Sequence, residues 1–135
     1  ASLEGWQWSS DGNFFWGTVN IRDPFLFFKL SASDWSLEQF DVPLEYQFEH
    51  ALNADKGLMV YSTRPWLGDI EEAMEFEKEK VPVFLYLSNL QSGDRKKIAT
   101  SIAKGFKPLW DDENTVSFDN PDGKGRNHFT IDLNF

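Results

Sequence analysis

Residues 44–50, LEYQFEH, alternate strictly between apolar and polar side chains, with Leu44, Tyr46 and Phe48 on one side. A period of two is typical of a β-strand with one buried face. Nearer the N-terminus, an Asp-Gly turn at residues 10–13 separates two stretches with strand character, which predicts a β-hairpin. Alternation or short apolar runs predict the further strands at 14–21, 25–30, 58–63, 81–88, 114–118 and 128–135.

Helical spacing of apolar residues is found mainly in the second half of the chain. Asp69 is a suitable N-cap for a helix with an acidic first turn and with Lys78 near its end, as the helix dipole favours. A second apolar stripe ends at Gly105, a residue type common just after a helix, and a start at Ser88 would lengthen that helix. We therefore expect helices at 68–80 and 94–104, and a short third helix within 31–43.

These elements predict an α+β fold, with an antiparallel β-sheet of about six or seven strands and two or three helices packed on one face. The sequence indicates no internal repeat, and its 135 residues suit a single domain over 1–135. Aromatic residues make up 16% of the chain, so we expect rings to fill much of the core.

The charge balance excludes several classes of partner. The formal net charge is −9, from 22 acids and 13 bases, which argues against nucleic acid and against an anionic membrane surface. The chain has no cysteine, which excludes disulfides and thiolate sites and favours a reducing, cytoplasmic location, although a chain that begins at Ala1 leaves the compartment open. No apolar run reaches membrane-spanning length. We expect no cofactor and no metal, and the oligomeric state is open.

Carboxylates gather in runs that contain no base. By alternation, Glu45 and Glu49 share the outward side of their strand, and the facing strand at 58–63 has no Lys to compensate them. Separate solvated surfaces would explain such runs, and the functional alternative is one negative patch that attracts a basic partner. Trp110 directly precedes three carboxylates, a combination typical of protein interfaces. The candidate partner-binding residues are Asp41, Glu45, Glu49, Trp110, Asp111, Asp112 and Glu113.

One basic cluster departs from the acidic character of the chain. Arg95, Lys96 and Lys97 fall in the first turn of the helix expected at 94–104, where the helix dipole disfavours cations. We expect carboxylates of the helix at 68–80 to compensate them, and an external acidic ligand is the alternative.

No catalytic sequence motif is present: G-x-S-x-G, the P-loop, H-E-x-x-H and G-x-G-x-x-G are all absent. His50 shares the aromatic side of its strand and is expected in the core. The leading hypothesis is therefore a non-enzymatic acidic binding protein that inhibits or neutralises a basic protein partner. An immunity-type protein that acts against a nuclease toxin is its concrete form.

Two alternatives come from other classes of function. If they are exposed, Trp6, Trp8 and Trp66 could stack on sugar rings, as in a carbohydrate- or small-ligand-binding module. His128 could act as an acid or base in a small hydrolase, with Asp132 or the carboxylates after Trp110 as its partner.

Overall fold

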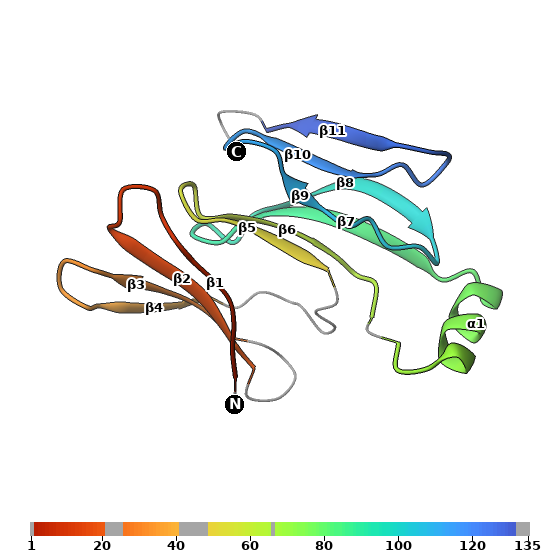
Figure 1. Cartoon of the computed structure of the whole chain (residues 1–135), viewed down its shortest axis with the longest axis horizontal. Coiled ribbons are helices and arrows are strands. Elements are labelled where there is room, and N and C mark those ends of the chain that lie inside the picture. The colour runs from red at the N-terminus through yellow and green to blue at the C-terminus, as the bar shows by residue number, and fades with distance from the viewer. Residues whose placement is uncertain (1, 21–25, 41–48, 66, 132–135) are drawn as a thin grey trace.

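The computed structural model describes residues 2–20, 26–40, 49–65 and 67–131, and it corrects the expected fold class (Figure 1). These residues form eleven strands in three antiparallel sheets of four, four and three strands, together with one helix. The expected single sheet with two or three helices on one face is therefore wrong. The described chain is mostly β, and its helix lies beside the ends of the strands rather than over a sheet (Figure 1).

The first sheet contains, in chain order, β1 (Ser2–Trp8), β2 (Phe14–Asn20), β3 (Leu26–Ser31) and β4 (Leu37–Phe40). The expected hairpin at the Asp-Gly turn is confirmed by the pairing of β1 with β2. The helix expected within 31–43 is wrong over its described part. The Asp34 carboxylate accepts a hydrogen bond from the backbone N–H of Ser36 at 2.9 Å, and this closes a turn into β4 instead of capping a helix. The same hydrogen bond lowers the pKa of Asp34.

The middle sheet contains, in chain order, β5 (His50–Asn53), β6 (Leu58–Ser62), β7 (Pro82–Asn89) and β8 (Arg95–Ile102). The helix expected at 94–104 is wrong, because most of this segment is β8 and pairs with β7. Its Ile and Ala spacing fits a helix, but a tight turn precedes it. The Asn89 side chain accepts hydrogen bonds from the backbone N–H groups of Gln91 and Ser92, and Gly93 has a φ of 80°. The turn reverses the chain direction, so that β8 pairs antiparallel with β7 and bonds the backbone N–H and C=O groups along its edge.

The helix α1 (Ile70–Lys78) is inserted between β6 and β7 and confirms the helix expected at 68–80. Asp69 is its N-cap, and the Asp69 carboxylate accepts a hydrogen bond from the backbone N–H of Glu72 at 2.7 Å. None of its residues is buried, and Ile70 and Met74 are exposed. Phe76 is half-buried against the core of the middle and third sheets, so α1 contributes only part of its apolar stripe to that core.

The third sheet contains β9 (Leu109–Trp110), β10 (Thr115–Asp119) and β11 (Arg126–Thr130). The hairpin expected between the last two predicted strands is confirmed, with β10 and β11 paired from Thr115 opposite Thr130 to Asp119 opposite Arg126. Residues 132–135, the end of the last predicted strand, lie outside the described residues.

Strand β6 of the middle sheet connects the three sheets, because all its residues are buried and its two faces pack on different cores. Leu58 and Val60 belong to a core shared with the third sheet. Met59 and Tyr61 alternate with them and pack in a second core with Trp16 of the first sheet, which is only 2% exposed. A strand that is buried on both faces is expected to be continuously apolar, as this one nearly is. The sheets therefore lie in succession, each packed on the next (Figure 1).

Gly57 lies where the first and middle sheets touch and gives a test of this packing. Its φ is 64°, and a Cβ added there would lie 3.0 Å from the Trp16 ring. Gly12 has a φ of 73° but open space around it, so it is a matched control. We expect Gly57→Ala to reduce the free energy of unfolding by about 2–3 kcal/mol, and Gly12→Ala by only about 1 kcal/mol. Chemical denaturation measures both losses, and equal losses would contradict close packing at Trp16.

Candidate functional site

A pocket forms where the first hairpins of the three sheets (β1–β2, β5–β6 and β9–β10) meet. Its volume is about 230 Å³. Two indole rings, Trp8 and Trp110, and three carboxylates, Asp55, Asp112 and Glu113, line it. We call these five residues the tryptophan pocket. No Lys or Arg occurs among the described residues that line it.

Hydrogen bonds between the middle and third sheets fix one side of the tryptophan pocket. The side-chain amide of Asn53 donates to the backbone carbonyl of Glu113 at 2.9 Å. The indole N–H of Trp110 donates to the backbone carbonyl of Ala51 at 3.0 Å. On the other side, the Gln7 side chain of the first sheet accepts a hydrogen bond from a backbone N–H of the middle sheet at 3.2 Å. The fold itself therefore positions the pocket.

The three hairpins repeat one pattern, a large apolar residue near the end of the first strand followed by a turn that contains Asp. Trp8, Leu52 and Trp110 hold the corresponding positions and all line the pocket. Trp8 and Leu52 are 44 positions apart, but Leu52 and Trp110 are 58 apart, because α1 and its connections are inserted in the middle sheet. The unequal spacing hides the repeat in the sequence. The similar segments QWSSDG and LWDDEN are the signal that could have revealed it.

The tryptophan pocket combines negative charge with accessible aromatic surface. Trp8 is 47% exposed, and its ring meets Phe15 edge-on with 5.2 Å between ring centres. The carboxylates of Asp55 and Asp112 each accept a backbone N–H, which orients them, while Glu113 is exposed. Carboxylates beside indole rings attract ammonium and guanidinium groups and repel anions. The pocket is therefore suited to a cation.

Three of the predicted partner-binding residues, Trp110, Asp112 and Glu113, are brought together in this pocket. Asp111 belongs to the same hairpin, but its carboxylate contacts the side chains of Ser117 in β10 and His128 in β11. Asp41 and Glu45 lie outside the described residues, and their part in binding stays a prediction.

The outward orientation predicted for Glu49 is wrong, because this residue is only 8% exposed. Its carboxylate accepts hydrogen bonds from the Ser62 hydroxyl (2.8 Å), from the backbone N–H of Phe106 (2.9 and 3.1 Å to its two oxygens) and from the backbone N–H of Lys107 (2.7 Å). The alternation does not reveal this burial, because the loop at 103–107 covers the Glu49 carboxylate. Glu49 is therefore a structural anchor of the loop at 103–107.

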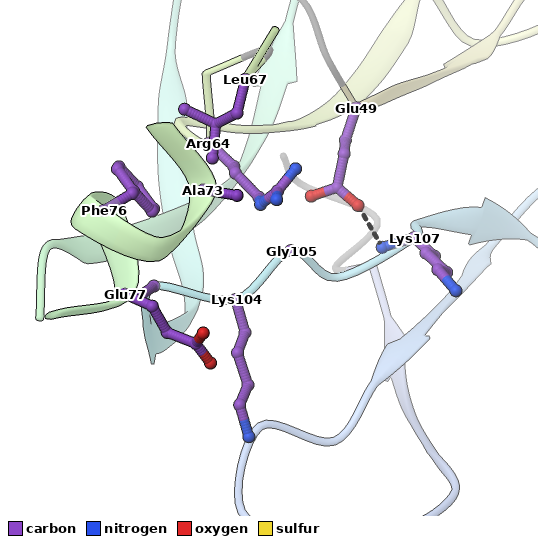
Figure 2. A pocket seen from close by; sticks show the side chains of 10 residues that line it. Glu49, Arg64, Leu67, Ala73, Phe76, Glu77, Lys104, Gly105 and Lys107 are labelled. Carbon is purple, nitrogen blue, oxygen red and sulfur yellow. Dashed lines mark hydrogen bonds between the residues drawn. The ribbon is translucent and has the colours of Figure 1, made fainter. Parts of the chain in front are cut away.

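Glu49 also lines a second, larger hollow of about 400 Å³ between α1 and the loop at 103–107 (Figure 2). Arg64, Lys104 and Lys107 line it together with Phe76 of α1. Figure 2 shows the guanidinium group of Arg64 pointing into it. Glu77 of α1 also lines the hollow, so its charges are mixed.

His128 and Asp111 form the contact that the hydrolase alternative requires, with 3.0 Å between Nδ1 and Oδ2. The other oxygen of Asp111 accepts a hydrogen bond from the Ser117 hydroxyl at 2.9 Å. Ser117 is buried beneath Arg126, which donates to the same hydroxyl. A serine nucleophile must hand its proton to the imidazole, and here the hydroxyl donates to the carboxylate instead. Asp132, the other predicted partner of His128, lies outside the described residues.

The basic cluster Arg95, Lys96 and Lys97 lies on the edge strand β8, so the expected pairing with α1 is wrong. Each cation instead lies over an aromatic ring, 4.3–5.3 Å from its centre. Arg95 also donates to the Tyr61 hydroxyl, and this bond raises the pKa of Arg95. Charges on an edge strand discourage pairing with another chain.

The tryptophans predicted to bind sugar differ in position. Trp8 is exposed, Trp6 lies in β1, and Trp66 lies outside the described residues. Among the residues that the structure describes, no three His, Asp or Glu side chains are grouped so that they could hold a metal ion. The one described helix is too short and too polar to cross a membrane.

The class of fold follows from the three sheets. Each is an up-and-down antiparallel meander, and the sheets stack in succession, which is the arrangement of blades in a β-propeller. Solved structures agree: an oligogalacturonate lyase from Vibrio parahaemolyticus matches 84% of this chain with a TM-score of 0.62 and 18% identity. An oligogalacturonate lyase in complex with manganese matches 85% of it with a TM-score of 0.60 and 19% identity.

The likeness covers only part of those proteins, because the chain spans 32% of the length of each. At such identities it shows the fold alone. TolB from Acinetobacter baumannii matches 97% of this chain with a TM-score of 0.48 and 12% identity, again over 32% of its own length. No family model matches the sequence, and no curated protein does.

Proposed function

We propose that this is a non-enzymatic binding protein that receives a cationic group of a basic protein partner in the tryptophan pocket. The observation that carries the proposal is the meeting of three carboxylates and two indole rings in one pocket, with no base among its described lining residues. A Lys or Arg side chain that enters would exchange its hydration for ion pairs and for the face of an indole.

The size of the pocket and the charge of the chain both support this proposal. A volume of about 230 Å³ suits a single inserted side chain rather than a drug-sized ligand, for which about 300–1,000 Å³ is usual. The net charge of −9 would speed the approach of a basic partner, and salt would slow it. Neutralisation of a nuclease toxin, as an immunity protein, and a cytoplasmic location both stay predictions within this proposal.

Removing two carboxylates from the pocket tests the proposal. Tri-arginine is the probe, and Trp fluorescence reports its binding. We expect Asp112→Asn combined with Glu113→Gln to weaken binding by about tenfold or more, because charge-assisted hydrogen bonds are lost. Glu71→Gln combined with Glu75→Gln removes the same charge from exposed positions on α1 and is the matched control. If both double variants weaken binding equally, the attraction is only the net charge, and the proposed pocket is wrong.

Carbohydrate binding is a second candidate, which the exposure of Trp8 favours. Two of the matched structures are oligogalacturonate lyases, which is a second reason to test this chain for sugar binding. Three carboxylates in the tryptophan pocket would repel a uronate, so a neutral sugar is the better probe for it. Maltohexaose binding that Trp8→Ala abolishes and the Asp112 and Glu113 changes leave intact would favour this candidate over the basic partner.

A further inference from the structure

We propose that the protein forms a symmetric dimer, in which one face of the first sheet packs on the same face of a second copy. The first sheet lies at one end of the stack of sheets (Figure 1). One of its faces packs on the middle sheet through Trp16, and the other is turned away from it. The proposed dimer goes beyond the binding of a basic partner, because it uses this second face.

Apolar side chains form a row across all four strands on the second face. In the pairing register, Trp8 lies opposite Phe15, which lies opposite Leu30. Leu30 in turn lies opposite Leu37 of β4, which is 64% exposed. Phe28 widens the row, with its ring centre 6.0 Å from that of Phe15. We call the following described residues the outer face: Trp8, Phe15, Phe28, Leu30, Leu37 and Gln39.

The charged residues of the same strands lie on the opposite side of the sheet, which is the side of Trp16. Lys29 is only 8% exposed, and its ammonium group lies 3.9 Å from the centre of the Phe14 ring. Glu38 lies opposite Lys29 in the register. The outer face, by contrast, has no Lys, Arg, Asp or Glu among its described residues. A solvated sheet face is usually polar, so this one has the composition of a surface that is covered.

A second copy of this chain is the occupant that fits the outer face. It supplies a sheet of the same twist, and such sheets pack face to face with their strands nearly aligned. Each copy has a net charge of −9, and two copies could meet here without opposing charges from the described residues of either face. The dimer would also continue the stacking of sheets on apolar cores that exists within the chain.

The outer side of the third sheet differs, and this difference determines the symmetry. On that side Arg126 pairs with Asp119 at 2.9 Å, and His128 pairs with Asp111 at 3.0 Å. Covering these groups would remove charges from water at a cost in free energy. A head-to-tail stack of the first sheet on the third is therefore disfavoured. Contact between two identical apolar faces closes a dimer with a two-fold axis.

Sedimentation equilibrium over a series of concentrations tests the proposal. We expect the mass to rise with concentration toward twice that of the monomer. Leu37→Glu should weaken the dimer by about tenfold or more, because the two-fold axis brings two new carboxylates into one apolar interface. Leu109→Glu makes the same change at a leucine that is 57% exposed, opposite Ser117 in the third sheet, and should leave the dimer unchanged.

A chain that stays monomeric into the millimolar range would overturn the proposal. Equal weakening by Leu37→Glu and Leu109→Glu would overturn it too, because that result indicates a head-to-tail stack. Gln39→Glu is the second variant should Leu37→Glu not fold. It places a carboxylate at an exposed position of the outer face, with an expected loss of about fivefold.

Nuclear Overhauser effects between labelled and unlabelled copies locate the interface directly. We expect the methyl groups of Leu30 and Leu37 to show contacts with aromatic rings of the other copy, and contacts from other surfaces alone would contradict the proposal. Leu37 lies in β4, at the opposite edge of the sheet from Trp8. Tri-arginine binding at the tryptophan pocket is therefore expected to be unchanged in Leu37→Glu, so the two proposals are tested separately.

Discussion

Glu49→Ala is expected to reduce the free energy of unfolding by about 3–5 kcal/mol, one of the two largest effects that the structure predicts for a single change. The carboxylate is nearly buried and accepts hydrogen bonds from the backbone N–H groups of Phe106 and Lys107 and from the Ser62 hydroxyl. Alanine would leave these donors without their acceptor in a site from which water is largely excluded. Urea denaturation followed by circular dichroism measures the loss.

Two further variants separate the hydrogen bonds from general effects of charge. Glu49→Gln keeps the shape and one acceptor oxygen but turns an amide toward N–H donors, so we expect a loss of about 2–3 kcal/mol. Glu113→Gln removes the same charge from an exposed side chain and should change stability by no more than about 0.5 kcal/mol. A loss below about 1 kcal/mol for Glu49→Ala would mean that solvent replaces the carboxylate, and that the loop is not anchored in this way.

Glu49 also shows why alternation in the sequence predicts an outward-facing carboxylate where the structure has a buried one. Alternation in residues 44–50 places Glu49 beside Glu45, and nothing local indicates that a loop 57 positions further on supplies its donors. A carboxylate that is paired with backbone N–H groups leaves no charged partner in the sequence to detect. Long-range satisfaction of a buried acid is a property of the tertiary fold.

Elements with strong local signals were predictable. The Asp69 cap identified α1, and the Asp-Gly turn identified the first hairpin. β8 was not predictable from its apolar spacing, because Ile98, Ala99 and Ile102 satisfy a helical stripe. Pairing with β7 overrides that preference.

The candidate site was predictable only where it is contiguous in the chain. Trp110, Asp112 and Glu113 are neighbours in the sequence and were identified as one group. Trp8 and Asp55 join them only because the sheets stack, and this succession was hidden by the insertion of α1. The fold thus adds the residues that turn an acidic run into a pocket.

The loop at 103–107 links the middle and third sheets through three kinds of contact. Glu49 of the middle sheet holds its N–H groups. From the third sheet, the backbone N–H of Asp119 donates to the Phe106 carbonyl at 2.7 Å, and Arg126 donates to the Lys107 carbonyl. The side chain of Phe106 supplies the apolar part of the same junction. It is 0% exposed and meets Phe118 edge-on, with 6.0 Å between ring centres.

Phe106→Ala is therefore expected to cost about 3–5 kcal/mol, because it removes a whole ring from the core between two sheets and leaves a cavity. Leu109→Ala, at an exposed position three residues later, is the matched control and should cost no more than about 0.5 kcal/mol. Chemical denaturation gives both values. Combining Phe106→Ala with Glu49→Gln should cost less than the sum of the two single changes by about 0.5 kcal/mol or more, since both loosen the same loop. Strict additivity would contradict a shared junction and would mean that the anchored carboxylate and the buried ring stabilise separate parts of the fold.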